Sequence, residues 1–230
     1  MKKPTVSKSL ALLLAAPLLA LPGAASASGS RPMNPPTAAQ EKQTPEQEAV
    51  ELYNDGIGYR DKAAQFEKEA AAEPDAKKRE KLEAKAKDKH LDSIKKFDKA
   101  TQKNPNLFQA WGSLGYAYRK TGDYNAALKA YNRALEIQPN YTPAIEYRAE
   151  AYLGLNQLDD VQVAYINLFN HDRPRADELA TAIDKYLEKK KADPSGVDAA
   201  KLEEFTKWAQ SRKQLAAQTS SVLKPAHERW

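Results

Sequence analysis

The sequence of 230 residues predicts an all-α solenoid, in which helix–turn–helix pairs stack on one another. Aromatic residues and helix-ending prolines match one another when the chain is shifted against itself by one fixed offset of about 34 residues. Within a repeat, the apolar residues recur at the spacing that places them on one face of a helix. Cysteine is absent, so the apolar core alone must hold the fold together.

Residues 1–27 have the layout of a secretory signal peptide. Three lysines precede the apolar run from Leu10 to Leu21, and small residues then lead to a cleavage site after Ala27. The apolar run is about a dozen residues long, whereas a helix that spans a bilayer needs about 20. No cysteine follows that could carry a lipid anchor. We therefore predict a periplasmic bacterial protein, with secretion as the alternative, and no stable membrane insertion after cleavage.

The charge of the chain is mixed along its length. Removing the signal peptide with its three lysines lowers the formal net charge from +5 to +2. Basic runs are short, such as Lys189 to Lys191, and acidic residues are interspersed among the basic ones. A nucleic-acid-binding protein usually carries a concentrated basic stripe, so we expect no nucleic-acid partner.

Residues 28–43 predict a disordered, proline-rich linker, because the segment has almost nothing apolar to bury. Order is expected to begin at Thr44-Pro45-Glu46-Gln47. A threonine that can cap, a proline in the first turn and a glutamine three residues after the cap form a helix-start signature.

The clearest repeat unit covers residues 108–141. Its first helix carries Trp111, Leu114 and Tyr118 on one face, and Gly115 leaves room for the second helix to approach. The two helices are separated by Thr121-Gly122-Asp123 and the unit closes at Pro139. The second helix presents the matching apolar positions Ala127, Tyr131 and Ala134.

In the order and spacing of these residues the unit resembles the tetratricopeptide repeat, with Tyr131 where phenylalanine is usual. The resemblance implies a right-handed superhelix whose concave groove holds a partner. It extends from residue 44 to 217. We expect a first unit at 44–107, a second at 108–141, a third at 142–173 and a fourth unit or cap at 174–217, followed by a flexible tail at 218–230.

The first unit is longer than the others. The stretch between Tyr59 and Phe97 is more than twice as long as the stretch between the corresponding Tyr118 and Tyr131. The additional residues are rich in alanine, glutamate and lysine, with a single break at residues 73–75. Their helix propensity favours two lengthened helices that form a hairpin arm, and a disordered loop is the alternative.

No pattern of catalytic residues is found. The three histidines, His90, His171 and His227, lie in different segments, and none pairs with another at the spacing of a helical metal site. Phosphate-binding glycine loops and nucleophile elbows are also absent from the sequence. We expect no catalytic residues, no metal and no cofactor.

The family resemblance implies that the first helix of each unit lines the groove. The residues carried over are Tyr53, Asn54, Ile57, Arg60, Gln109, Ser113, Tyr116, Arg119, Lys120, Glu146, Tyr147 and Glu150. Asn54 matches an asparagine of the carboxylate-binding members, whose lysines are replaced here by Tyr53 and Gly112.

The predicted function is that of a non-enzymatic scaffold or adaptor that binds a protein or peptide segment in this groove. Two alternatives remain. One is an accessory subunit of an envelope assembly complex that docks through the long first hairpin. The other, of a different class, is a cell-wall or glycan enzyme or a cofactor-binding module.

Overall fold

A computed structural model describes residues 43–223 of the chain. The predicted signal peptide at 1–27 and nearly all of the predicted linker at 28–43 lie outside the described residues, as do residues 224–230. The described residues belong to one compact unit, and the description below concerns this unit by itself.

The described residues form eight α-helices and no strand. The helices are α1 (Pro45–Ala72), α2 (Ala76–Lys103), α3 (Phe108–Thr121), α4 (Tyr124–Ile137), α5 (Thr142–Gly154), α6 (Leu158–His171), α7 (Arg173–Ala192) and α8 (Ala199–Leu223).

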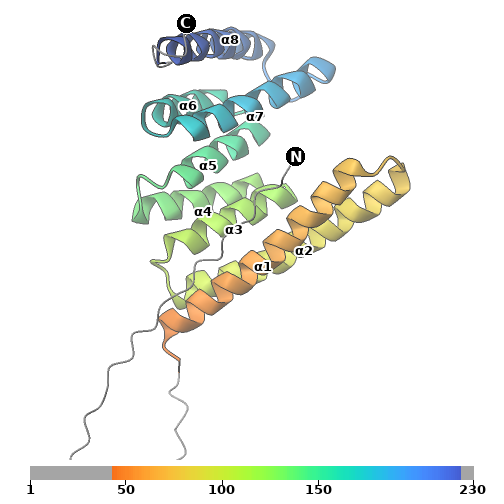
Figure 1. Ribbon diagram of the computed structural model, residues 1–230, viewed down its shortest axis with the longest axis vertical. Helices are drawn as coiled ribbons and strands as arrows, with labels where there is room; N and C mark the ends of the chain where they lie inside the picture. Colours follow the sequence, from red (N-terminus) through yellow and green to blue (C-terminus); the bar gives the residue numbers. More distant parts are fainter. Residues whose placement is uncertain (1–42, 224–230) are drawn as a thin grey trace, which may run out of the picture. The chain divides into compact units, whose positions relative to one another are not determined.

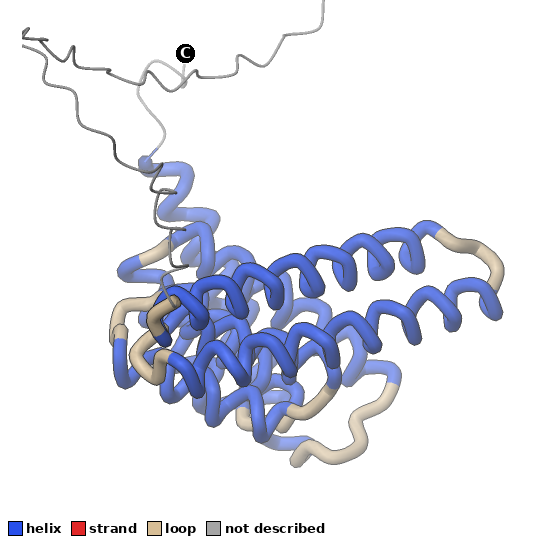
Figure 2. The backbone as a smooth tube through the Cα atoms, turned by 90° about the horizontal axis from the view of Figure 1, so that it is seen from below, coloured by secondary structure: helices blue, strands red, loops and turns tan. Residues whose placement is uncertain are grey.

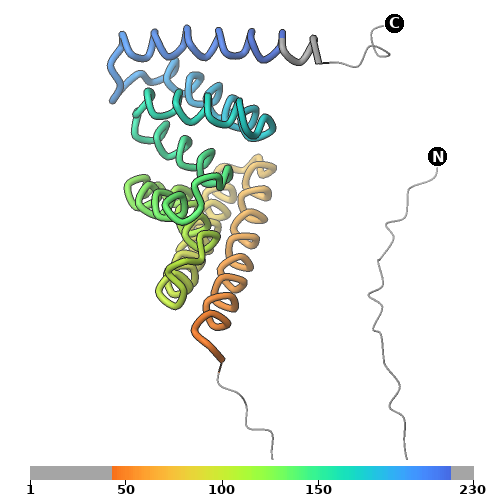
Figure 3. Tube along the Cα trace, turned by 90° about the vertical axis from the view of Figure 1, so that its left-hand side faces the viewer, coloured from red at the N-terminus to blue at the C-terminus, as the bar shows by residue number. Residues whose placement is uncertain are grey.

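The helices pack as successive pairs, which confirms the predicted all-α solenoid. Helix α1 packs on α2, α3 on α4 and α5 on α6, and each pair contacts the next. The first helices of neighbouring pairs also touch, α1 with α3, α3 with α5 and α5 with α7. Figures 1 and 3 show the pairs layered in chain order from α1 and α2 to α8. We call the surface formed by α1, α3, α5 and α7 the inner face.

Helix α1 begins where the sequence predicts. The Thr44 side chain accepts a hydrogen bond from the Gln47 backbone N–H at 3.3 Å, and the Gln47 side chain accepts one from the Thr44 N–H at 2.9 Å. Pro45 occupies the first turn, where its missing N–H leaves no intrahelical bond unmade. This reciprocal capping satisfies two of the backbone donors that a helix start exposes.

The predicted hairpin arm is confirmed. Helices α1 and α2 are 28 residues long each, twice the 14 residues of α3 and α4. The turn between them lies at residues 73–75, and Asp75 caps α2 by accepting from the Lys78 backbone N–H at 2.9 Å. Figure 2 shows the two long helices extending side by side beyond the rest of the stack.

Glycine allows the closest helix contacts in the first two units. A Cβ atom built on Gly115 would lie 2.6 Å from the ring of the fully buried Tyr131. At the equivalent place in the first unit, a Cβ on Gly56 would lie 2.5 Å from the ring of Phe97. The room that the sequence assigns to Gly115 is therefore filled by an aromatic ring of the paired helix.

The last unit consists of α7 and α8. Phe205 of α8 is buried, and its ring stacks on Trp208, which in turn meets Tyr165 of α6 edge-on. Helix α7 begins at Arg173, one residue before the predicted unit, and α8 continues to Leu223, past the predicted start of the tail at residue 218. Between residues 43 and 223 no helix has the combination of length and apolarity that crossing a bilayer requires.

Candidate functional site

A hollow of about 390 Å³ opens on the inner face between α1, α3, α5 and α7. Four half-buried tyrosines line it, together with Arg60 and Arg175, small residues and Pro143. Among the described residues, no carboxylate belongs to this lining. The tyrosines are Tyr53, Tyr116, Tyr141 and Tyr147. We call this hollow the tyrosine pocket.

The tyrosine rings are held by contacts between successive first helices. Tyr116 of α3 meets Tyr147 of α5 edge-on, with 5.3 Å between ring centroids. The guanidinium of Arg119 lies over both rings, 5.2 Å from each centroid. Cations in this position are attracted by the negative face of an aromatic ring. Tyr116 and Tyr147 are thus oriented before any ligand arrives.

Arg119 connects helices rather than offering its charge to solvent. Its side chain is only 13% exposed and forms an ion pair with Glu150 of α5. Removing one partner of a buried ion pair leaves the other charge uncompensated, which is costly. Arg119 and Glu150 are therefore a strut between α3 and α5.

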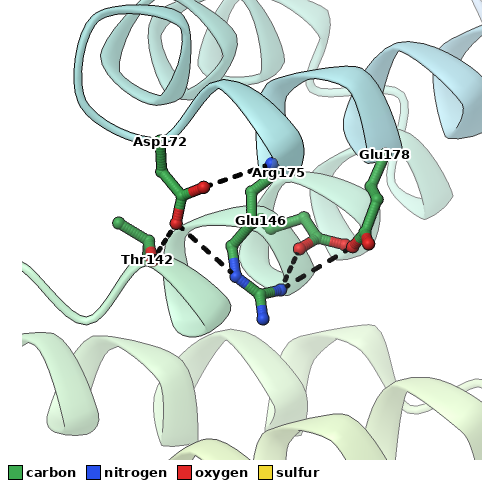
Figure 4. Close-up of polar contacts among 5 residues, drawn as sticks. All are labelled: Thr142, Glu146, Asp172, Arg175 and Glu178. Atoms are coloured by element: carbon green, nitrogen blue, oxygen red, sulfur yellow. Dashed lines mark hydrogen bonds and ion pairs between the residues drawn. The ribbon is translucent and has the colours of Figure 1, made fainter.

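A second strut connects α5 to α7 and is drawn in Figure 4. Arg175 forms an ion pair with Glu146, and its guanidinium also lies 3.8 Å from Asp172 and 3.8 Å from Glu178. Asp172 accepts hydrogen bonds from the Thr142 hydroxyl at 2.6 Å and from the Arg175 backbone N–H at 3.3 Å. These contacts fix the guanidinium of Arg175 at the edge of the tyrosine pocket.

Glu146 is the most deeply buried carboxylate of this strut, with 3% of its surface exposed. Burial raises the pKa of Glu146 to about 7, although the hydrogen bond from Arg175 acts in the opposite direction. Desolvation favours the neutral acid because a charge loses more hydration free energy on burial than a neutral group does. The second strut therefore changes its charge near neutral pH.

A polar cluster joins the arm to α3 beside the tyrosine pocket. Glu67 of α1 lies 2.9 Å from the ring nitrogen Nε2 of His90 and 2.9 Å from Nζ of Lys120. Burial opposes ionisation of Glu67, but the hydrogen bonds from His90 and Lys120 outweigh it and lower its pKa to about 2. The ring of the buried His90 meets Tyr116 edge-on at 6.0 Å.

A second hollow of about 380 Å³ lies on the inner face at the C-terminal ends of α3, α5 and α7. Three lysines of α7, Lys185, Lys189 and Lys190, contribute to its lining, and we call it the lysine pocket. Arg119 and Glu150 belong to its lining as well.

The predicted groove residues are divided among several places. Five of them line the tyrosine pocket: Tyr53, Arg60, Ser113, Tyr116 and Tyr147. Arg119 and Glu150 lie at the lysine pocket. The other five lie outside both linings: Asn54, Ile57, Gln109, Lys120 and Glu146.

Four of these five have identifiable surroundings, and Lys120 is the one that pairs with Glu67 in the polar cluster described above. Asn54 lines a separate shallow hollow with Asp55, Gly58 and Tyr59, and Ile57 packs against the apolar cluster around Phe97. Asn54, which matches the carboxylate-binding asparagine of the family, therefore lies outside the tyrosine pocket in this chain. Glu146 is buried and forms an ion pair with Arg175.

Sequence reasoning missed two prominent members of the tyrosine pocket, Tyr141 and Arg175. They are separated by one repeat length and occupy equivalent positions of successive units, so the repeat offset could have found them had the groove positions, and not only the core positions, been extended to the fourth unit. The three lysines of α7 carry no such signal, because a lysine-rich helix end is ordinarily only a solvated surface. Within residues 43–223, no group of three potential metal ligands is found.

Comparisons with known proteins agree with this architecture. A family model for the tetratricopeptide repeat matches residues 108–141, which are the predicted second unit. Superkiller protein 3 of Saccharomyces cerevisiae is 33% identical over 63 residues, 27% of this chain and 4% of that protein. Its Schizosaccharomyces pombe counterpart is 42% identical over 59 residues, 26% of this chain and 4% of that protein.

Hsp70-Hsp90 organizing protein 3 of Arabidopsis thaliana is 22% identical over 100 residues, 44% of this chain and 18% of that protein. The matched region therefore spans less than a fifth of the length of each of these relatives. The family match, the repeat periodicity of the sequence and the stacked helix pairs agree that residues 108–141 form a tetratricopeptide repeat within an all-α solenoid.

Proposed function

We propose that this protein is a non-enzymatic scaffold that binds a segment of another protein on its inner face. The observation that carries the proposal is the tyrosine pocket, where four tyrosines and two arginines surround one open hollow. Tyrosine and arginine are among the side chains that most often dominate the free energy of protein–protein binding. The pocket is preorganised by the two struts, which lowers the entropy lost when a partner binds.

The proposed place of action is the bacterial periplasm. Its support is the sequence of residues 1–27, with their basic, apolar and small-residue segments. A repeat scaffold in this compartment would meet envelope proteins as partners, and secretion to the medium is the alternative destination.

The test is a pull-down from envelope extract with a matched pair of charge reversals. Arg60→Glu alters the tyrosine pocket, where the side chain forms an ion pair with its neighbour Asp61. Arg133→Glu makes the same charge change on α4, away from both pockets. We expect Arg60→Glu to reduce recovery of the stoichiometric partner at least tenfold, and Arg133→Glu to leave it unchanged.

A third variant addresses docking through the hairpin arm, which projects beyond the stack (Figure 2). Lys78→Glu changes an exposed residue near the tip of the arm. Loss of the partner with Lys78→Glu, and retention with Arg60→Glu, would move the binding surface to the arm and favour an accessory subunit. Recovery of glycan without any protein would contradict the scaffold and favour a glycan-binding or glycan-cleaving protein.

A further inference from the structure

In the linings of the two hollows of the inner face, cationic side chains outnumber carboxylates. Among the described residues, the tyrosine pocket is lined by two arginines and no carboxylate, and the carboxylates that pair with these arginines lie outside the lining: Glu146 is buried beside Arg175 and Asp61 is exposed beside Arg60. The lysine pocket is lined by four cationic side chains and one carboxylate, and that carboxylate, Glu150, is already paired with Arg119. The nearly neutral total charge expected of the mature chain therefore conceals a local surplus of cations, which is largest at the lysine pocket.

Two of the three lysines of the lysine pocket are available to a ligand. Lys185 and Lys189 are exposed, and neither forms an ion pair with any of the residues between 43 and 223. Lys190 is held in place, because its Nζ donates to the Ser195 carbonyl oxygen at 2.6 Å and lies 5.8 Å from the centre of the Tyr186 ring. The nearby Asp193 has its pKa lowered chiefly by hydrogen bonds from Ser195, and it lies outside the lining of the hollow.

The walls of the lysine pocket are closely packed and partly apolar. Tyr124 and Leu153 belong to the lining, and a Cβ atom on Gly154 would lie 2.5 Å from the Tyr124 ring. Asn156, with a positive φ of 58°, donates to the Gly196 carbonyl oxygen at 2.7 Å and accepts from the Tyr186 hydroxyl at 2.8 Å. The turn after α5 is thus fixed against the end of α7, and the hollow has a defined shape.

The tyrosine pocket and the lysine pocket are adjacent, and the ion pair of Arg119 and Glu150 lies between them. Arg119 lines the lysine pocket, and its guanidinium lies over Tyr116 and Tyr147, which line the tyrosine pocket. Glu150 neutralises this central arginine. On one side of it lie Lys185 and Lys189, which have no ion pair among the described residues, and on the other side lies Arg60, whose partner is the exposed Asp61. One extended segment that crosses the strut would reach both hollows.

From these contacts we infer that the inner face is a two-pocket site for an acidic protein segment. This inference rests on the proposed scaffold function and specifies its ligand. Carboxylates of the segment meet Arg60 at one pocket and Lys185 and Lys189 at the other, while an aromatic or apolar side chain packs among the four tyrosines. Complementary charge speeds association and selects the partner, and the tyrosine contacts supply binding free energy that salt does not screen.

The test selects random twelve-residue peptides, displayed on phage, against the full chain. We expect the enriched peptides to contain clustered aspartate or glutamate beside at least one aromatic or large apolar residue. An enriched peptide and its counterpart with glutamine and asparagine in place of the acids are then compared by fluorescence anisotropy. The neutral counterpart should bind at least tenfold more weakly, about 1.4 kcal/mol.

A matched pair of double variants tests whether the lysine pocket takes part in peptide binding. Lys185→Glu with Lys189→Glu reverses the free cations of the lysine pocket, whereas Lys99→Glu with Lys129→Glu makes the same charge change on the surfaces of α2 and α4, outside both pockets. We expect the first double variant to bind the acidic peptide at least tenfold more weakly than the wild type does, with a smaller dependence of the affinity on salt. The second pair should change the affinity less than twofold, and the two should have equal helical content by circular dichroism.

Each outcome separates this inference from the function on which it rests. Enriched peptides that are neutral or basic, and that still lose binding with Arg60→Glu, would overturn the acidic ligand and leave the scaffold function intact. Acidic peptides that bind the Lys185→Glu, Lys189→Glu variant as tightly as they bind the wild type would overturn the two-pocket site. Binding of single-stranded DNA as tightly as the peptide would show generic attraction of polyanions and overturn the acidic-segment site, and no enrichment of peptides would contradict both proposals.

Discussion

Two glutamates, Glu146 and Glu67, show how strongly the surroundings of a carboxyl group can shift its pKa in either direction. Burial raises the pKa of Glu146 to about 7, and the hydrogen bonds from His90 and Lys120 to Glu67 prevail over burial and lower its pKa to about 2. Both carboxylates face a cationic side chain, so the presence of a cation does not explain the difference. It arises because Glu146 is almost completely buried, with 3% exposed, while the Glu67 side chain keeps 32%.

The raised pKa of Glu146 predicts a pH dependence of stability. Between pH 4.5 and 7 the folded state keeps the proton that the unfolded state releases, so the free energy of unfolding should fall as the pH rises through this range, by about 3 kcal/mol from this group. Glu146→Gln should remove this contribution, and Glu178→Gln, at an exposed side chain, should retain it. Urea unfolding at pH 5 and pH 8 measures the difference, and an equal pH dependence for wild type and Glu146→Gln would contradict it.

Glu67 gives a contribution of the opposite sign. Because its folded pKa lies below the unfolded value, its ion pair stabilises the protein above about pH 4.5, and this stabilisation is lost as the pH falls toward 2. As the pH falls, the pair of Glu146 and Arg175 should therefore lose its charge first, near pH 7, and the contacts of Glu67 with His90 and Lys120 should weaken only near pH 2.

At the scale of the helix, the glycines divide into those that a ring covers and those that face open space. Gly115 and Gly56 each receive the ring of the paired helix. Gly58, only two residues after Gly56 in the same helix, has no atom within 4 Å of the place where a Cβ would be. Replacing either of two nearby glycines of one helix by alanine should therefore have opposite effects on the free energy of unfolding.

This division predicts opposite effects of the same substitution. Gly115→Ala should destabilise the protein by about 1–3 kcal/mol, because the Tyr131 ring cannot retreat within a packed core. Gly58→Ala should stabilise it by about 0.5–1 kcal/mol, because alanine loses less backbone entropy in a helix. Thermal and urea unfolding of the two variants measure the effects; a stabilising Gly115→Ala would mean that the contact with Tyr131 is looser than described.

At the scale of the whole molecule, the proposed export would determine which partners the inner face can meet. Mature protein should begin at Ser28, because the small residues before it match the specificity of signal peptidases. Mass spectrometry of the protein released by osmotic shock checks the new N-terminus, and its presence in the medium would indicate secretion. Leu13→Lys interrupts the apolar run and should leave the precursor uncleaved inside the cell. A wild-type protein that retains Met1 would contradict export.

Local sequence information predicted most of the fold. The capping residues at Thr44, the break at residues 73–75 and the repeat offset each depend on neighbours along the chain or on the repeat. The α-helical hairpin arm follows from helix propensity, which acts locally as well. The extension of α8 to Leu223 was missed, because helix ends without a capping signal are poorly marked in a sequence.

The repeat register by itself determined that the chain is a stack of helix pairs and that Tyr53, Arg60, Ser113, Tyr116 and Tyr147 share a face. Tertiary structure alone decided what the charged residues do. Arg119 and Glu146 became struts because the first helices of successive units bring them opposite partners. The lysines of α7 became part of a hollow because α3 and α5 end beside them. Periodicity specifies which way a side chain faces, whereas its partner across the stack depends on packing distances that no single helix contains.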